Sequence, residues 1–203
     1  MHPVIYREFE RICSQRSWRG AAVLDVGAVL SERGLLRMKA IDGAAERIGV
    51  NLAGPCDDGH LRILQANANR MDCFEDGRFD LVVCNGMLEH DKYFWKTAAE
   101  IRRVLKPGGM AVACAAGYRY YGFEQFKRLL WKTPLIRRLL RRPYLNVFFT
   151  GTFTYEIHAA PGDYYRFSPQ AFREVVFEGM TDVVVSSLML PPRIIGHGFK
   201  PAR

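Results

Sequence analysis

Three apolar runs, each ending at a glycine or a polar loop, constrain this chain more than any other feature. They are Val23–Gly27 (VLDVG), Phe79–His90 (FDLVVCNGMLEH) and Leu105–Gly109 (LKPGG). Continuous apolar runs that stop abruptly are typical of buried strands and packed helices in an open α/β sheet. The loops after such strands gather outside their carboxyl ends, where nucleotide-like ligands bind. The sequence therefore predicts a ligand cleft at that edge.

Length and composition predict one globular domain over residues 1–203. Of the 203 residues, 49% are apolar and 25% are charged, which is the balance of an ordinary globular protein. No apolar run approaches the ~20 residues that a membrane-spanning helix needs, and acids near the N-terminus argue against a secretory signal. Five scattered cysteines without a Cys-x-x-Cys pair favour reduced, mostly buried thiols in a cytoplasmic protein, with no metal site.

Strands and helices alternate in the first part of the chain. Strands are expected at 21–27, 47–52, 61–66, 79–85 and 110–116, and helices at 3–16, 31–43 and 91–105. This alternation predicts an α/β fold: a Rossmann-like, doubly wound, mostly parallel sheet with right-handed crossovers. A helix capped by Ser168 and a C-terminal antiparallel hairpin, 182–190 and 193–199, complete the expected fold.

The alternation breaks after the fifth strand. Residues 118–168 form a connection too long to be idle in a compact domain. We expect this helical and loop insertion to act as a lid or as an acceptor-binding segment.

Two of the apolar strings resemble motifs of a known family. After VLDVG, the strings 79–90 and 100–110 (EIRRVLKPGGM) are similar to the fourth-strand and post-helix motifs of class I S-adenosylmethionine-dependent methyltransferases that act on small molecules. The resemblance covers residues 20–117. It implies S-adenosyl-L-methionine as cofactor and methyl transfer to an oxygen or nitrogen of a small-molecule acceptor.

The same resemblance implies a set of cofactor contacts. Asp25 and the Gly27 backbone would meet the amino-acid end, since a carboxylate accepts hydrogen bonds from an ammonium and glycine lets the main chain approach closely. The alternative for Asp25 is a carboxylate satisfied by loop amides, and for Met87 it is simple packing. The full set of expected cofactor-binding residues is Asp25, Gly27, Asn51, Leu52, Asn67, Ala68, Asn85 and Met87.

Three departures from the family pattern weaken this expectation. Val29 and Ser31 stand where the family has further glycines, so the loop after Gly27 must be wider or differently bent. Asn51 and Asn67 stand where acids would bind the ribose hydroxyls and the adenine amine. A neutral hydrogen bond is roughly half as strong as a charge-assisted one. A non-catalytic binding or scaffold protein derived from a methyltransferase therefore remains an alternative.

Two histidines are candidates for a catalytic base. His90 follows the predicted fourth strand, and a histidine side chain there could serve as a general base; its alternative is a hydrogen bond to the local backbone. His158 lies in the insertion near Asp163 and Arg166. His158 and Asp163 could form a base with its orienting carboxylate, or Asp163 and Arg166 could pin the loop.

The net charge of +8 is concentrated in one segment. Residues 126–142 contain seven basic residues and no acid, in alternating apolar and basic pairs. One or two short helices broken at Pro134 would place the leucines on one side. The segment could be a lid helix, a helix on an anionic membrane surface, or a binding element for an acidic acceptor; nucleic acid is the weaker candidate partner. The oligomeric state is left open.

Overall fold

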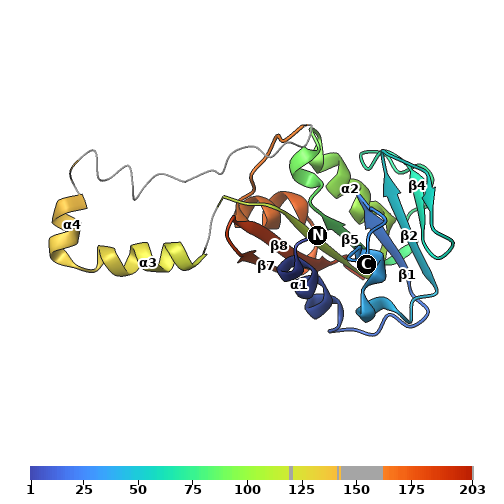
Figure 1. The fold of residues 1–203 in the computed structure, drawn as a ribbon, viewed down its shortest axis with the longest axis horizontal. Coiled ribbons are helices and arrows are strands. Elements are labelled where there is room, and N and C mark those ends of the chain that lie inside the picture. The colour runs from blue at the N-terminus through green and yellow to red at the C-terminus, as the bar shows by residue number, and fades with distance from the viewer. Residues whose placement is uncertain (119–120, 141, 143–161, 203) are drawn as a thin grey trace.

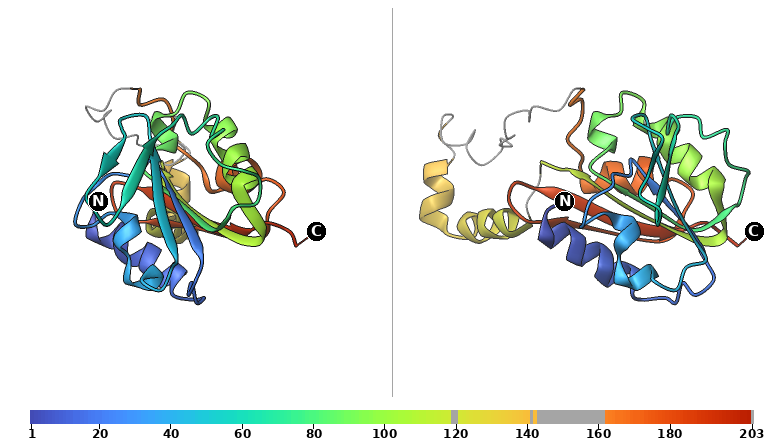
Figure 2. Two further views of the ribbon diagram at one scale, coloured as in Figure 1. Left: turned by 90° about the vertical axis from the view of Figure 1, so that its right-hand side faces the viewer. Right: turned by 45° about the vertical axis from the view of Figure 1, so that its right-hand side comes forward.

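The computed structural model describes residues 1–118, 121–140, 142 and 162–202 (Figure 1). An eight-stranded sheet with the order β3-β4-β2-β1-β5-β6-β8-β7 forms the centre of the molecule. Helix α1 covers one face of the sheet, and α2 with α6 and η4 covers the other (Figure 2). In the described ranges, none of the helices is long and apolar enough to cross a membrane.

The strands are β1 (Ala22–Val26), β2 (Glu46–Asn51), β3 (Cys56–Asp57), β4 (Arg62–Gln65), β5 (Phe79–Asn85), β6 (Leu105–Ala116), β7 (Thr181–Leu188) and β8 (Arg193–Phe199). The α-helices are α1 (Pro3–Cys13), α2 (Phe94–Val104), α3 (Tyr121–Trp131), α4 (Pro134–Leu140) and α6 (Pro169–Ala171). Short helical turns are η1 (Leu35–Arg37), η2 (Lys39–Ile41), η3 (Leu88–His90) and the π-helical η4 (Phe172–Val176).

The pairing confirms the predicted fold class. Strands β4, β2, β1, β5 and β6 are parallel, whereas β8 pairs antiparallel with β6 and with β7. In register, Val26 lies opposite both Val50 and Cys84. The next residue on each of these three segments therefore emerges at the same edge of the sheet, and these residues are Gly27, Asn51 and Asn85.

Side chains of β1 alternate between the two faces, as the period of a strand requires. Val23 packs with α1 residues on one face, while Leu24 and Val26 pack on the α2 face. Three of the five cysteines are buried, and Cys56 and Cys73 are exposed.

The prediction of a helix at 31–43 is wrong. This stretch folds into the two short 3₁₀ turns η1 and η2, with Met38 extended between them. The carboxylate of Glu10 on α1 accepts from the backbone nitrogens of Lys39 at 2.7 Å and Ala40 at 3.0 Å. Leu35, Leu36, Met38 and Ile41 are all buried, a spacing that one helical face cannot provide.

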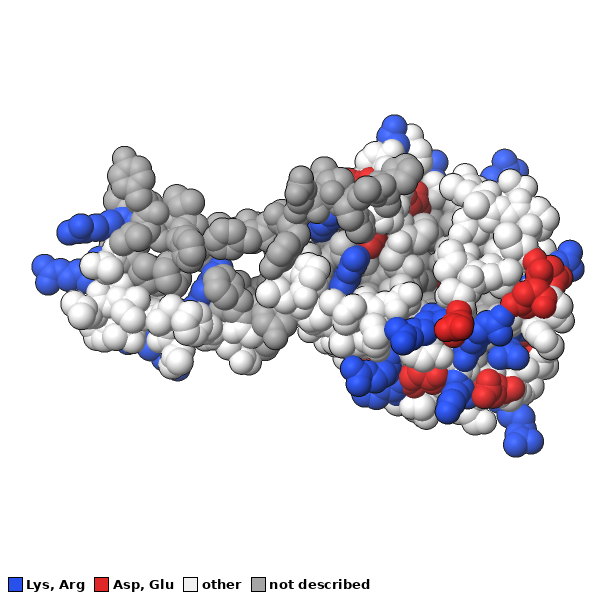
Figure 3. Space-filling view, viewed as in Figure 1, with Lys and Arg blue, Asp and Glu red and all other residues white. Residues whose placement is uncertain are grey.

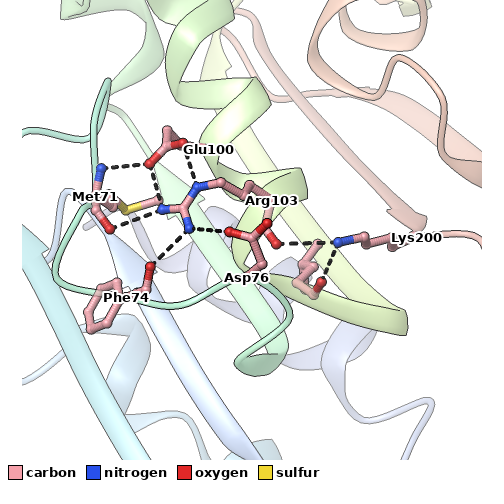
Figure 4. A network of polar contacts seen from close by, with 7 residues as sticks. Met71, Phe74, Asp76, Glu100, Arg103 and Lys200 are labelled. Carbon is pink, nitrogen blue, oxygen red and sulfur yellow. Dashed lines mark hydrogen bonds and ion pairs between the residues drawn. The ribbon is translucent and has the colours of Figure 1, made fainter.

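Residues 66–78 join β4 to β5 without forming a helix. Arg103, in the last turn of α2, organises it through five hydrogen bonds (Figure 4). Its guanidinium donates to the carbonyl oxygens of Met71 and Phe74 and to the carboxylates of Asp76 and Glu100. These bonds from Arg103 lower the pKa of Glu100. One planar donor group thus fixes a loop where a crossover helix would otherwise pack.

The later elements follow the sequence expectation closely. The Ser168 hydroxyl accepts from the backbone nitrogen of Ala171 at 2.9 Å and caps α6, with Pro169 at the first helical position. The C-terminal hairpin forms as β7 and β8. The basic segment forms the two short helices α3 and α4, divided before Pro134.

Candidate functional site

A cleft of about 510 Å³ lies at the carboxyl edge of β1, β2, β4 and β5. Its size falls within the ~300–1,000 Å³ of typical small-molecule sites. The lining comes from the loops after these four strands, from η3 and from the end of the insertion. The lining residues are Gly27, Val29, Val50, Asn51, Leu52, Ala66, Asn67, Ala68, Asn69, Gly86, Met87, His90, Asp91, Lys92 and Tyr164.

The structure brings together most of the residues singled out in the sequence. Those that line the cleft are Gly27, Asn51, Leu52, Asn67, Ala68, Met87 and His90. Asp25 and Asn85 lie at the ends of β1 and β5, outside the lining. His158 lies outside the described residues.

Gly27 has two independent reasons to be glycine. Its φ of +85° is a conformation that other residues rarely adopt. A Cβ at this position would also lie 2.9 Å from Cβ of Met87. The backbone nitrogens of Gly27 and Ala28 both donate to the Val50 carbonyl, at 2.9 and 3.0 Å. The loop therefore turns back over β2 and leaves the cleft open, with Val29 on its lining and 61% exposed.

Asn51 ties this loop to the end of β2. Its side-chain nitrogen donates to the Ala28 carbonyl at 2.8 Å, and its side-chain oxygen accepts from the backbone nitrogen of Ala53 at 3.0 Å. An ionised aspartate could not make the first of these bonds, because it has no donor. The Asn51 amide therefore anchors the loop after Gly27, and it keeps one amide hydrogen and one lone pair for a ligand.

The wall after β4 is a turn held by asparagines. The side-chain oxygen of Asn67 accepts from the backbone nitrogen of Asn69 at 2.9 Å. The Asn69 amide donates to Asp91 at 2.6 Å and to the Thr97 hydroxyl at 2.8 Å, and Thr97 donates to Asp91 at 2.7 Å. This cluster joins the loop after β4 to the start of α2, with Thr97 fully buried.

Sequence reasoning missed Asn69 as a lining residue and placed residue 91 only as the start of a predicted helix. Asp91 does accept from the backbone nitrogen of Tyr93 at 2.8 Å, but its other oxygen holds Asn69 and Thr97. The only signal in the sequence was the repeated asparagine in Gln65–Asn69. The partners lie 22 and 28 positions apart, so only the fold joins them.

Apolar side chains exposed inside the cleft form its second kind of surface. Leu52 is 69% exposed and Tyr164 is 54% exposed. Met87 and Ala68 are partly buried against the core beside them. Exposed apolar groups among a few convergent amides are typical of a site for a flat ring carrying polar edges.

Asp25 is buried, with 5% exposure, on the same face of the sheet as Val23. Burial raises the pKa of its carboxyl from 3.8 to about 7. No ion pair to Asp25 is found among the described residues. Its carboxyl would gain stability from a cation brought to the end of β1.

Comparisons with known proteins agree with this architecture. Residues 26–113 match the family model described as a methyltransferase domain. This match spans 88 of the 203 residues of the chain. A comparison with curated protein sequences gives no match.

Solved structures of methyltransferases share the fold. A 1,6-didemethyltoxoflavin-N1-methyltransferase from Burkholderia thailandensis, solved with its toxoflavin precursor and S-adenosylhomocysteine, superposes with a TM-score of 0.60 at 18% identity, over 97% of this chain and 78% of that one. Phosphoethanolamine N-methyltransferase 2 from Haemonchus contortus, solved with phosphomonomethylethanolamine and S-adenosylhomocysteine, gives 0.60 at 16% identity, over 96% of this chain. This chain covers 52% of the Haemonchus protein.

A third similar chain comes from the complex between the Haloferax volcanii Trm112 methyltransferase activator and a methyltransferase. It gives a TM-score of 0.59 at 16% identity, over 96% of this chain and 91% of that one. At these identities the likeness shows the fold.

The end of the insertion packs directly beside the cleft. The backbone nitrogens of Tyr164 and Tyr165 donate to the Glu89 carbonyl at 2.8 and 3.2 Å. The Tyr165 hydroxyl donates to the Lys92 carbonyl at 2.9 Å. These bonds place the Tyr164 ring in the lining, opposite the strand loops.

The Glu89 side chain joins the start of the insertion to the hairpin. Its Oε1 accepts from the backbone nitrogen of Ala116 at 3.2 Å and from the Arg193 guanidinium at 2.8 Å. The side chain is 1% exposed, and its Oε2 has no hydrogen-bond partner among the described residues. Phe167 in turn donates to the Ala116 carbonyl at 2.9 Å. Glu89 therefore contacts both ends of the insertion, which the sequence did not reveal.

His90 and the Asp163–Arg166 pair lie on either side of this junction. His90 lines the cleft at the end of η3, and its backbone nitrogen donates to the Met87 carbonyl at 2.9 Å. The Arg166 guanidinium forms an ion pair with Asp163, whose side chain is 1% exposed. That contact is the one expected if the pair pins the loop.

Proposed function

We propose that this protein binds S-adenosyl-L-methionine in the cleft and transfers its methyl group to an oxygen or nitrogen of a small-molecule acceptor. The observation that supports this best is the cleft itself. It opens at the carboxyl edge of a parallel sheet, beside a Gly27 that tolerates no side chain, and it combines asparagine amides with exposed apolar groups. Two similar structures hold S-adenosylhomocysteine together with small-molecule acceptors.

The lining divides into parts that suit the parts of the cofactor. Leu52 and Ala68 offer apolar surface for the adenine, and Asn67 has an amide group for its polar edge. Asn51 keeps one amide hydrogen and one lone pair for the ribose hydroxyls. Gly27 leaves main chain accessible to the amino-acid end, and Asp25 behind it would become ionised beside an ammonium.

When bound, the cofactor supplies a methyl group already activated by a sulfonium. The protein therefore has to align the acceptor and exclude water, which is worth about 7–11 kcal/mol of the barrier. Tyr164 and the return of the insertion cover the side of the cleft where an acceptor would enter. His90, on the same side, would take the acceptor proton, and a general base adds typically 10²–10⁴-fold.

Calorimetry with S-adenosylmethionine and S-adenosylhomocysteine tests the first step. We expect Leu52→Asp to weaken both affinities at least tenfold, because it places a charge against the adenine surface; tenfold is about 1.4 kcal/mol. Leu190→Asp is the matched control, since Leu190 is 61% exposed in the turn between β7 and β8 and is not among the residues that line the cleft. Binding of neither compound by the native protein would refute the proposal.

Turnover on a panel of phenol and amine acceptors tests the second step. We expect His90→Ala to lower kcat by 10²–10⁴-fold with the cofactor Kd unchanged, and His158→Ala measured in parallel separates the two candidate bases. Cofactor binding without methyl transfer to any acceptor would instead support the non-catalytic alternative. The engagement of Asn51 by the loop backbone is the observation that favours that alternative.

A further inference from the structure

Helices α3 and α4, hereafter the α3–α4 arm, project away from the sheet-bearing part of the molecule (Figures 1 and 2). Their apolar side chains are exposed. Phe126 is 53%, Leu129 is 65%, Leu135 is 76% and Leu139 is 54% exposed. Exposed apolar groups gathered in this way mark an interaction surface.

Both helices of the arm are amphipathic. On α3, Phe126, Leu129 and Leu130 follow the i, i+3, i+4 spacing of one helical face. On α4, Leu135 and Leu139 are separated by four positions and share a face in the same way. Lys127 and Arg128 on α3, and Arg137 and Arg138 on α4, fall outside these apolar sets, so each short helix carries cations beside an apolar face.

The arm is strongly basic, and Glu124 near the start of α3 is the one acid in the sequence of its two helices. Residues 126–142 carry seven basic residues and no acid. Arg128, Lys132, Arg137, Arg138 and Arg142 are exposed, and basic side chains lie along the arm in Figure 3. Long basic side chains can rest their methylenes on an apolar boundary while their charged ends stay in water.

We propose that the α3–α4 arm lies on the surface of an anionic lipid bilayer, with its apolar face in the headgroup region and its arginines on the lipid charges. Both requirements of an interfacial helix are met, an apolar face and a polybasic one. Trp131, which is 45% exposed at the end of α3, suits the aromatic zone of such an interface. The cleft would then face acceptors that reach it at the membrane surface.

Lipid accounts for the arm better than nucleic acid does. Phosphates of a nucleic acid would satisfy the arginines but leave the apolar faces of Leu129 and Leu135 in water. Packing on the protein's own body, the lid interpretation, does not cover these faces in the structure. A bilayer surface with anionic lipids can bury the apolar faces and neutralise the arginines at the same time.

Vesicle co-sedimentation of the full chain tests the proposal. Vesicles of phosphatidylcholine containing about 30% phosphatidylserine, a strongly anionic surface, are compared with pure phosphatidylcholine. We expect binding to the anionic vesicles that weakens with added salt. Changing Arg137, Arg138 and Arg142 together to Gln should lower the partition coefficient roughly 100-fold, from about fivefold per cation.

The matched control changes Arg7, Arg62 and Arg173 to Gln, which removes the same charge from exposed positions outside the arm. We expect it to bind vesicles nearly as well as the native protein. A second variant, Leu129, Leu135 and Leu139 to Ser, should also abolish binding while all seven basic residues remain. Equal losses in the arm and control variants would overturn the proposal, because binding would then follow net charge alone.

Two further outcomes would also overturn it. One is tight binding of a single-stranded RNA with no binding to vesicles. The other is a lipid-free dimer that the leucine-to-serine variant converts to a monomer, since the arm would then be covered by a second copy of the chain. None of these measurements uses methyl transfer, so they stand apart from the proposed function.

Discussion

Two leucines, Leu81 in the sheet and Leu135 in the arm, have very different exposures to solvent. Leu81, in β5, is fully buried between β1 and β6, whereas Leu135, in α4, is 76% exposed. The charged groups of the body and of the arm also differ in the balance of positive and negative charge. Glu89 and Arg193 form a shielded ion pair in the body, while residues 126–142, which make up most of the arm, contain seven basic residues and no acid.

This difference shows what each region needs in order to be stable. The body contains its own partners, so its apolar and charged groups are satisfied within the fold. The arm has the composition of an interface, but no partner among the described residues covers its exposed apolar side chains. Substitutions in the body should therefore change folding, and substitutions in the arm should change association alone.

The largest expected contrast comes from truncating the two leucines. Leu81→Ala should lower the free energy of unfolding by about 2–5 kcal/mol, because it leaves a cavity in a packed core. Leu135→Ala should change it by less than about 0.5 kcal/mol. Chemical denaturation of both variants measures this. Similar losses for the two would mean that α4 packs on the body in solution.

A smaller effect is expected at the root of the insertion. Glu89→Ala should lower the free energy of unfolding by about 2–3 kcal/mol, less than for a fully buried pair because Arg193 is 22% exposed. Arg137→Ala in the arm should have no measurable effect, since exposed charges contribute little. Thermal denaturation compares the two. If Glu89→Ala were neutral, the contact between the insertion and the hairpin would not depend on this carboxylate.

The last prediction concerns Asp25, a buried carboxyl in the body that has no ion pair among the described residues. Since burial raises the pKa of Asp25 to about 7, the folded state binds an extra proton between pH 4 and 7 relative to the unfolded chain. The free energy of unfolding should therefore fall as the pH rises through this window and level off above it.

Asp25→Asn should remove that fall and make the variant more stable than the native protein at pH 8, by about 4 kcal/mol, because the folded pKa lies about three units above its ordinary value. Denaturation curves measured from pH 4 to 8 give the comparison. A native protein whose stability rises across this window, with Asp25→Asn falling below it, would show that the carboxylate is ionised and satisfied by a group in the fold.

The strands could be predicted because their signal is local. An apolar run such as 79–85 ends at Gly86, and its burial does not depend on which element covers it. The cleft could be placed for the same reason, since parallel strands bring their carboxyl ends to one edge. Gly27, Asn51 and His90 were therefore found from their positions in the chain.

The connections could not be predicted in this way. Residues 31–43 have apolar side chains that suit a helix in composition, yet Glu10 from a distant helix fixes them as 3₁₀ turns. Asn69 and Glu89 were missed because their partners lie far away in sequence. Glu89 and Arg193 are 104 positions apart.

By itself, the sequence determined the parallel sheet, the order of its motifs, the edge at which a ligand would bind and the amphipathic character of the arm. These depend on the periodicity of neighbouring residues and on strand ends. The tertiary structure decided how the loop after Gly27 closes, that Asn51 anchors it, that Asn69 and Asp91 join in one wall, and that the arm's apolar face stays exposed. Those depend on hydrogen bonds and contacts between distant segments, which form only once the chain has folded.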